Sequence, residues 1–266
     1  MALVGPPMYT SGAMLLAADI GNTHIHLGLF EGENLLATTK FPGDRVTELE
    51  EEWARFRGPG AAATPIAGAV VCSVNPKAKI PFCHWVARRF GARPRVVGED
   101  LRIPIELCVD AKDEVGADRI VNAYAAWRLL GEGPIVVADF GTAITLDVVS
   151  ERGEYLGGAI APGFDTAARA LSTRTALLPY VKVAPADRAI GRNTIDALKS
   201  GLYFGLIGLV DALCERVAAE LPRPPRWLAT GGDAPLVAER SRFLRDVRPN
   251  LTLDGLRLGW EAASKS

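Results

Sequence analysis

The feature of this sequence that most clearly suggests ligand binding or catalysis is a carboxylate at the end of an apolar run, followed by a glycine turn. The run Leu15–Ala18 leads into Asp19, and Gly21, Asn22 and Thr23 follow. Glycine lets backbone approach a ligand closely, the two polar residues supply neutral donors, and the carboxylate can hold a hydrated Mg²⁺. The turn suits the phosphates of a nucleoside triphosphate, although an ordinary Gly-Asn hairpin turn would contain the same residues.

The same order of residues occurs again, a domain's length further along the chain. Ile135–Ala138 is apolar, Asp139 ends the run, and Gly141 and Thr142 follow. An alternating run comes next in both copies, which predicts a strand, a tight turn and an antiparallel strand. Two such hairpins could hold phosphates from two sides, so the repetition favours phosphate binding over an ordinary turn.

Between the two copies, Gly116, Asp118 and Arg119 open a helix that is predicted over Ile120–Leu130. An aspartate in a first turn is often only a cap or a partner of the helix dipole. Beside Gly116 and Arg119, however, the carboxylate of Asp118 can accept a hydroxyl proton. The Arg119 guanidinium can bind a substrate carboxylate through two hydrogen bonds. The three residues together suit an acceptor that carries both an alcohol and a carboxylate.

Three further segments have compositions that favour ligand contact or close packing. Gly157–Gly163 is expected to be a ligand-facing loop, and Thr230–Gly232 is expected to lie against adenine or ribose. Asn193 or Thr194 is expected to cap a long helix, and Thr194 could also present its hydroxyl to a ligand. The pattern within that helix predicts close packing against a neighbour at Gly201, Gly205 and Gly208.

Composition excludes several other classes of protein. The 266 residues are 48% hydrophobic and 23% charged with a formal net charge of −1, as in an ordinary globular chain without bulk attraction to nucleic acid. No apolar run approaches bilayer length and no signal peptide is recognisable, so we expect a cytoplasmic protein without membrane contact. Neither a P-loop nor a dinucleotide-binding glycine motif is present.

Cysteine and histidine do not predict a metal cluster. The four cysteines are scattered, which predicts reduced thiols and neither a disulfide framework nor a zinc site; they are Cys72, Cys83, Cys108 and Cys214. His24 and His26 share one face of a predicted strand, where we expect them beside phosphates or in packing contacts.

The elements that must position these residues form two α/β units of similar order. In the first, three strands in a meander precede a helix, a strand, a helix and a strand, which is the order of RNase H-like domains in actin-like sugar kinases. We therefore predict two duplicated RNase H-like domains with the active site in the cleft between them. The predicted division is a leader or tag over residues 1–13, an N-terminal domain over 14–113 and a C-terminal domain over 114–266.

Seven segments in order resemble the type III pantothenate kinase family, the actin-like kinases of bacterial coenzyme A synthesis. Each is weak alone, but together they are specific and span nearly the whole chain from Met14. They are Asp19–His26, Gly116–Arg119, Asp139–Thr142, Gly157–Gly163, Thr175–Pro179, Gly191–Thr194 and Thr230–Gly232.

The resemblance implies ATP-dependent phosphorylation of pantothenate to 4′-phosphopantothenate. It implies ATP-binding residues at Asp19, Ile20, Gly21, Asn22, Thr23, His24, Ile25, His26 and Thr142. It implies pantothenate-binding residues at Gly116, Ala117, Asp118, Arg119 and Thr194, with Asp118 as the general base. It also implies Mg²⁺ with ATP, a monovalent cation (K⁺ or NH₄⁺) at Asp139, and a homodimer with the acceptor pocket near the subunit interface.

The chain departs from the family's pattern at two positions before Gly116. Val109 stands where the family commonly has a tyrosine that lines the pantothenate pocket, and Lys112 stands where a proline is frequent. Both departures bear on acceptor affinity more than on chemistry. The alternatives are another actin-like phosphotransferase or exopolyphosphatase, and a non-catalytic regulator like the Bvg accessory factor; the retention of both base and phosphate-binding residues argues against a regulator.

Overall fold

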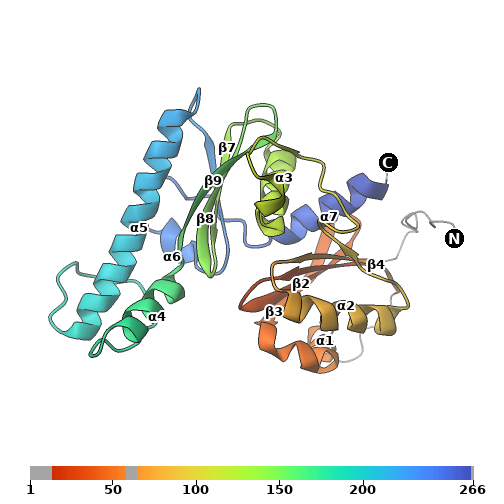
Figure 1. The fold of residues 1–266 in the computed structure, drawn as a ribbon, viewed down its shortest axis with the longest axis horizontal. Coiled ribbons are helices and arrows are strands. Elements are labelled where there is room, and N and C mark those ends of the chain that lie inside the picture. The colour runs from red at the N-terminus through yellow and green to blue at the C-terminus, as the bar shows by residue number, and fades with distance from the viewer. Residues whose placement is uncertain (1–13, 58–64, 265–266) are drawn as a thin grey trace. The chain divides into compact units, whose positions relative to one another are not determined.

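The structure is a computed structural model that describes residues 14–57 and 65–264. It divides into two compact units, whose strands and helices are labelled in Figure 1. The first unit contains the chain up to Ile105, then Asp113–Arg128 and the C-terminal segment from Leu251; the second contains Glu106–Lys112 and Leu129–Asn250. The predicted leader over residues 1–13 lies outside the described residues.

The first unit is built on a five-stranded mixed sheet in the order β3-β2-β1-β4-β5. β2 pairs antiparallel with β1 and with β3, whereas β1–β4 and β4–β5 are parallel pairs. The predicted meander followed by parallel strands is therefore present. The strands are β1 (Met14–Ile20), β2 (His24–Glu31), β3 (Asn34–Pro42), β4 (Ile66–Ser73) and β5 (Arg95–Val96).

Two helices cover one face of this sheet, α1 (Leu49–Arg57) after a short 3-10 helix and α2 (Pro76–Phe90). α2 begins at a proline, where the missing N–H costs nothing, and the Asn75 side chain accepts a hydrogen bond from the Ala78 N–H. It ends at Gly91, whose φ of 69° is the left-handed conformation that glycine adopts without strain. The two helices and the sheet share one apolar core.

The opposite face of the first sheet is covered by α7 (Leu251–Ser264), the last helix of the chain. A Cβ built on Gly28 would lie 2.9 Å from Leu253 Cδ1, and one on Gly68 would overlap the Trp260 ring. The two glycines therefore let the helix lie directly on the sheet. On its other side α7 contacts α3 (Ala117–Leu130), because a Cβ on Gly255 would lie 2.6 Å from Val121.

The sheet of the second unit has the order β10-β7-β8-β9-β6. Read from β9 to β10, its strands β9-β8-β7-β10 repeat the order β3-β2-β1-β4 of the first sheet, and β6 is an additional strand beside β9. β7, β8 and β9 form the antiparallel meander, and β10 pairs parallel with β7 as β4 does with β1. A parallel bridge from Ala229 to Val247 takes the place that β5 has in the first sheet. The strands are β6 (Glu106–Leu107), β7 (Ile135–Phe140), β8 (Ala143–Val149), β9 (Glu154–Pro162) and β10 (Arg226–Thr230). The predicted duplication is confirmed.

Three helices belong to the second unit, α4 (Phe164–Arg174), α5 (Thr194–Glu220) and α6 (Ala234–Ala238). By length and composition α5 alone among the described helices could span a membrane, but its apolar side contributes to the buried core of this unit. A Cβ on Gly201, Gly205 or Gly208 would meet no atom of the described chain within 4 Å. The prediction that these glycines pack against a neighbouring element is wrong within this chain.

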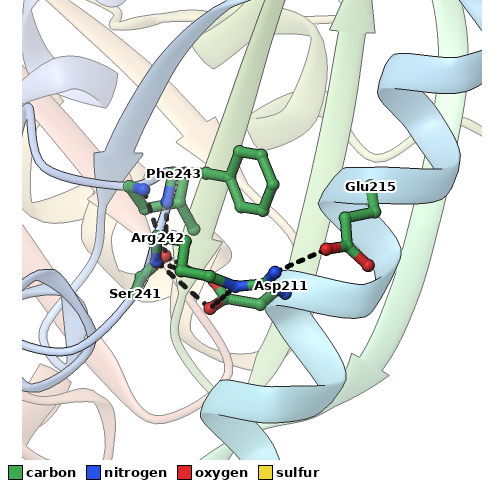
Figure 2. Close-up of polar contacts among 6 residues, drawn as sticks. Asp211, Glu215, Ser241, Arg242 and Phe243 are labelled. Carbon is green, nitrogen blue, oxygen red and sulfur yellow. Dashed lines mark hydrogen bonds and ion pairs between the residues drawn. The ribbon is translucent and has the colours of Figure 1, made fainter.

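A buried carboxylate on α5 fixes the segment that follows α6. Figure 2 shows Asp211 accepting hydrogen bonds from the Ser241 hydroxyl at 2.7 Å and from the backbone N–H of Arg242 at 3.1 Å. The Arg242 guanidinium spans Asp211 and Glu215, at 3.2 and 2.5 Å.

The observed units differ from the sequential division at residue 113 that the sequence predicts. Asp113–Arg128 and the segment from Leu251 group with the first sheet. The reason is the contact of α7 with both the sheet and α3, which brings two later segments back to the first unit. The segment between β5 and α3 also contains β6, which pairs with β9.

We expect the hydrogen bond between α7 and α3 to contribute measurably to stability. Thr252 Oγ1 donates to Asn122 Oδ1 at 2.8 Å, and both side chains are buried. Thr252→Val keeps the shape but removes the donor, so it should lower the free energy of unfolding by about 1–2 kcal/mol. Thr252→Ser keeps the hydroxyl and should lose less. Denaturant unfolding measures both; a valine variant as stable as the wild type would contradict the prediction.

Candidate active site

The turn between β1 and β2 presents backbone and small polar side chains to solvent. The Gly21 N–H donates to the His24 carbonyl at 3.0 Å, and the Gly43 N–H donates to the Thr23 carbonyl at 2.9 Å. A Cβ on Gly21 would lie 3.3 Å from the same His24 oxygen, so glycine allows the tight closure. Asn22 and Thr23 are exposed beside it. The predicted hairpin with a tight turn after Asp19 is therefore present.

Three side chains that could take part in binding or catalysis lie in one row across the first sheet. The strand register pairs Asp19 on β1 with His26 on β2 and with Cys72 on β4. Paired residues point to the same side of a sheet, and the neighbours Ala18 and Ile20 point into the core under α1 and α2. The row therefore faces the side of the sheet on which α7 lies.

Burial keeps the histidines of this turn neutral. It lowers the pKa of His26 to about 4, with a smaller contribution from the charge of Lys40. Burial and then Lys40 also lower the pKa of His24, against the opposing charge of Asp44. At neutral pH both imidazoles are uncharged, so they can serve as hydrogen-bonding groups but do not supply positive charge.

Asp118 lies in the first turn of α3, where its carboxylate accepts a hydrogen bond from the Arg119 N–H at 2.9 Å. A Cβ on Gly116 would lie 2.6 Å from Asp118 Oδ1, so glycine makes room for the carboxylate. Burial raises the pKa of Asp118 above its usual value, while the N–H and the charge of Arg119 lower it. A carboxylate with a raised pKa is a stronger base once it is ionised.

Asp118 and Asp19 act on the same buried thiol. Burial raises the pKa of Cys72 well above its usual value, and the charges of Asp19 and Asp118 raise it further. The charges of two carboxylates distant in sequence therefore both act on Cys72 within the first unit. The sequence predicts both carboxylates but not the cysteine, whose place beside Asp19 follows only from the pairing of β1 with β4.

In the second unit, Asp139 ends β7 next to the turn that follows β10. A Cβ on Gly231, whose φ is 91°, would lie 2.5 Å from both Asp139 Oδ1 and the Phe140 carbonyl oxygen. The Asp233 N–H donates to that same carbonyl at 3.2 Å. The predicted Thr230–Gly232 segment and the predicted aspartate are therefore brought together, with two hard oxygen atoms beside one glycine.

The predicted loop over Gly157–Gly163 is wrong, because residues 157–162 form the second part of β9, paired with β8. The second turn is joined to the end of this strand, just before α4. The carbonyl of Thr142 accepts hydrogen bonds from the Gly163 N–H at 3.1 Å and from Thr166 Oγ1 at 2.6 Å. A Cβ on Gly163 would overlap the Gly141 carbonyl, so this approach requires glycine. Thr142 itself is exposed. The structure thus brings Thr142 and the end of the Gly157–Gly163 segment together.

Thr194, the last of the predicted pantothenate-binding residues, and Val109 both lie in the second unit. Asn193, not Thr194, caps α5, because its side chain accepts a hydrogen bond from the Asp196 N–H at 2.9 Å. Thr194 is the exposed first residue of that helix. Val109 lies beside β9, where a Cβ on Gly157 would be 3.5 Å from Val109 Cγ1. The departure at Val109 is therefore a neighbour of the glycine-rich part of β9.

Among the described residues, no group of three or more histidine, cysteine or acidic side chains is placed to hold a metal ion. Asp19 and Asp139 each offer carboxylate oxygens, the ligand type that Mg²⁺ and alkali cations prefer. Each carboxylate can therefore contribute one ligand to an ion that also binds phosphate, backbone carbonyl groups or water.

Comparisons with known proteins agree with the motifs. The model of the type III pantothenate kinase family matches residues 15–216. A type III pantothenate kinase of Dehalococcoides mccartyi strain CBDB1 is 44% identical over 91% of this chain and 94% of its own length. One from a Parafrankia species is 46% identical over 93% and 98%.

A solved structure supports the fold at low sequence identity. A ROK family glucokinase from Streptomyces griseus, in complex with glucose and AMPPNP, superposes with a TM-score of 0.52. The match covers 96% of this chain and all of the glucokinase chain, at 15% identity. It shows that the two mixed sheets have the actin-like arrangement of strands and helices, as the sequence predicts.

Proposed function

This chain belongs to the type III pantothenate kinase family, and from that premise we propose how its residues carry out the reaction. The enzyme transfers phosphate from ATP to pantothenate, giving 4′-phosphopantothenate for coenzyme A synthesis. The observation that carries the assignment is the family match over residues 15–216, which includes both Asp-x-Gly turns and Asp118. The chain is a metabolic enzyme, and we propose that it works in the cytoplasm.

ATP phosphates would be bound by the two turns. The exposed residues after Asp19 offer backbone N–H groups and neutral side chains, and Thr142 offers a hydroxyl. The Asp19 carboxylate fits the Mg²⁺ that accompanies ATP, and this ion would supply charge neutralisation at the phosphates. Because His26 is neutral, it can form a hydrogen bond to a phosphate oxygen without placing a second positive charge beside the Mg²⁺.

Pantothenate would be bound by Gly116–Arg119 and Thr194, with Asp118 as the base. Arg119 can pair with the pantothenate carboxylate through its guanidinium. Asp118 accepts the proton of the primary hydroxyl while that oxygen forms a bond to the γ-phosphorus and the bond to the ADP oxygen breaks. The pKa of Asp118 is raised by burial, so the ionised base is lost as pH falls through that raised value.

Asp118→Asn should abolish the base while preserving the fold. We expect kcat to fall by about 10²–10⁴-fold, with a KM for ATP close to that of the wild type and no acidic limb from Asp118 in the pH profile. The assay is ADP release with and without pantothenate, with the product identified by mass. Asp113→Asn, a nearby exposed carboxylate, is the matched control.

Two results would contradict this assignment. A near-normal kcat in the Asp118→Asn variant would remove Asp118 from the base role without affecting the family assignment. Release of ADP by the wild type regardless of pantothenate would indicate another acceptor or hydrolysis, and no release by a folded wild type would favour a regulator.

A monovalent cation would be bound at Asp139. The support is that Asp139 Oδ1 and the Phe140 carbonyl lie beside the same position on Gly231, which gives two oxygen ligands of the type that K⁺ accepts. Such a cation would add positive charge near the phosphates. Glycine at position 231 permits the close approach of both oxygens, since any Cβ there would collide with them.

Replacing K⁺ and NH₄⁺ by Na⁺ should lower the wild-type rate several-fold, because the smaller ion fits the same oxygens less well. Asp139→Asn should be slow in all three salts and lose the difference between them. Asp187→Asn, an exposed carboxylate of the same unit, should behave as the wild type. Equal wild-type rates in Na⁺ and K⁺ at constant ionic strength would show that Asp139 has no such role.

We also propose that the enzyme is a homodimer that uses the exposed side of α5. Gly201, Gly205 and Gly208 recur at helical spacing and face open space, and Leu209 beside them is exposed. Small residues at this spacing let two helices approach closely. Other apolar side chains of the same unit are strongly exposed, among them Leu177 at 90% and Ile190 at 82%.

Sedimentation equilibrium should give the wild type a mass of twice the 28.4 kDa of one chain. Gly205→Glu should dissociate it, because the new charge would be buried without a partner. Gly205→Ala keeps the position small and apolar and should remain dimeric. A dimeric Gly205→Glu variant would place the interface elsewhere, and a wild type that sediments as one chain would refute the dimer.

A further inference from the structure

Lys40 on β3 extends the row of functional side chains across the first sheet. The register pairs Lys40 with His26, and His26 with Asp19, so the three residues occupy adjacent positions on β3, β2 and β1. Residues paired in this way point to one side of the sheet. A basic side chain therefore lies on the same face as the proposed phosphate turn, from a strand outside the motif.

The Lys40 ammonium group is near the turn and has no acidic partner. It is the basic group whose charge acts on both imidazoles, His24 and His26. Within residues 14–57 and 65–264, the structure gives Lys40 no ion pair, whereas Lys79 of the same unit pairs with Glu99. Lys40 is exposed, so its flexible side chain can reach a ligand without first leaving a carboxylate.

The negative charge of a bound nucleoside triphosphate would attract the ammonium group of Lys40. The β1–β2 turn itself offers neutral donors and the carboxylate of Asp19, and a nucleoside triphosphate carries several negative charges. Phosphoryl transfer depends mainly on positioning and on neutralising the charge of the transferred group. A lysine adjacent to the turn supplies positive charge where the turn has none of its own.

We propose that Lys40 is an ATP-binding residue whose ammonium group contacts the terminal phosphates. The inference rests on the proposed phosphate site at Asp19–His26 and adds a residue that the motif does not contain. Its contribution requires the phosphates and not the nucleoside, because only the phosphates carry the charge that the ammonium group complements.

Lys40→Gln removes the charge and keeps most of the length of the side chain. We expect the KM for ATP to rise about tenfold or more, with a lower kcat and a KM for pantothenate within about twofold of the wild type. Lys40→Arg should recover most of the loss. Lys77→Gln, an exposed lysine on α2 without an ion pair, is the matched control and should leave all constants unchanged.

Equilibrium binding separates this inference from the proposed function. Titration calorimetry with a non-hydrolysable ATP analogue should show weaker binding to Lys40→Gln, whereas binding of AMP should be unchanged. If the wild type makes phosphopantothenate and Lys40→Gln matches it in KM and kcat for ATP, the inference about Lys40 is wrong and the proposed function stands. If the wild type neither binds the analogue nor releases ADP with pantothenate, the proposed ATP site itself fails.

Discussion

Burial of β1 and β7 on both faces is the constraint on which the rest of the structure depends. Both strands pair with a neighbour on each side, and their first residues are apolar and buried. A charge among those residues would lose its hydration, and it would need buried partners to compensate. Exposure increases only at the next-to-last residue of each strand, where both units have an aspartate, Asp19 and Asp139.

The electrostatics of the first unit follow from the same burial. Low exposure leaves His26 uncharged, keeps the Cys72 thiol protonated and makes Asp118 a better base than a solvated aspartate. The carboxylates that act on Cys72 are those of Asp19 and Asp118, and Asp44 lies near His24. Positive charge comes from Arg119 and Lys40, which lie on different elements and can act on opposite ends of the reaction.

The sequence was sufficient for features that depend on neighbours along the chain. Both hairpins, the repeated strand order and the helix that starts at Gly116–Arg119 follow from local patterns, and the family motifs identify the reaction. Contacts between segments that are distant in the chain could not be predicted from the sequence. The place of Cys72 beside Asp19 needs the parallel pairing of β1 with β4, and the grouping of α7 with the first unit needs the fit of Trp260 over Gly68. The glycines of α5 look like packing sites from their spacing, yet they contact nothing in the described chain.

The return of α7 to the first sheet has a consequence for biosynthesis. Every segment of the second unit precedes Leu251, whereas the first unit lacks a helix until Leu251–Ser264 has left the ribosome. The first sheet is therefore synthesised before the second unit but completed after it, which inverts the usual order of domain completion during translation. Until α7 emerges, the sheet surface around Gly28 and Gly68 is an apolar face without its cover, so a nascent chain that stalls before Leu251 presents that face to chaperones and proteases.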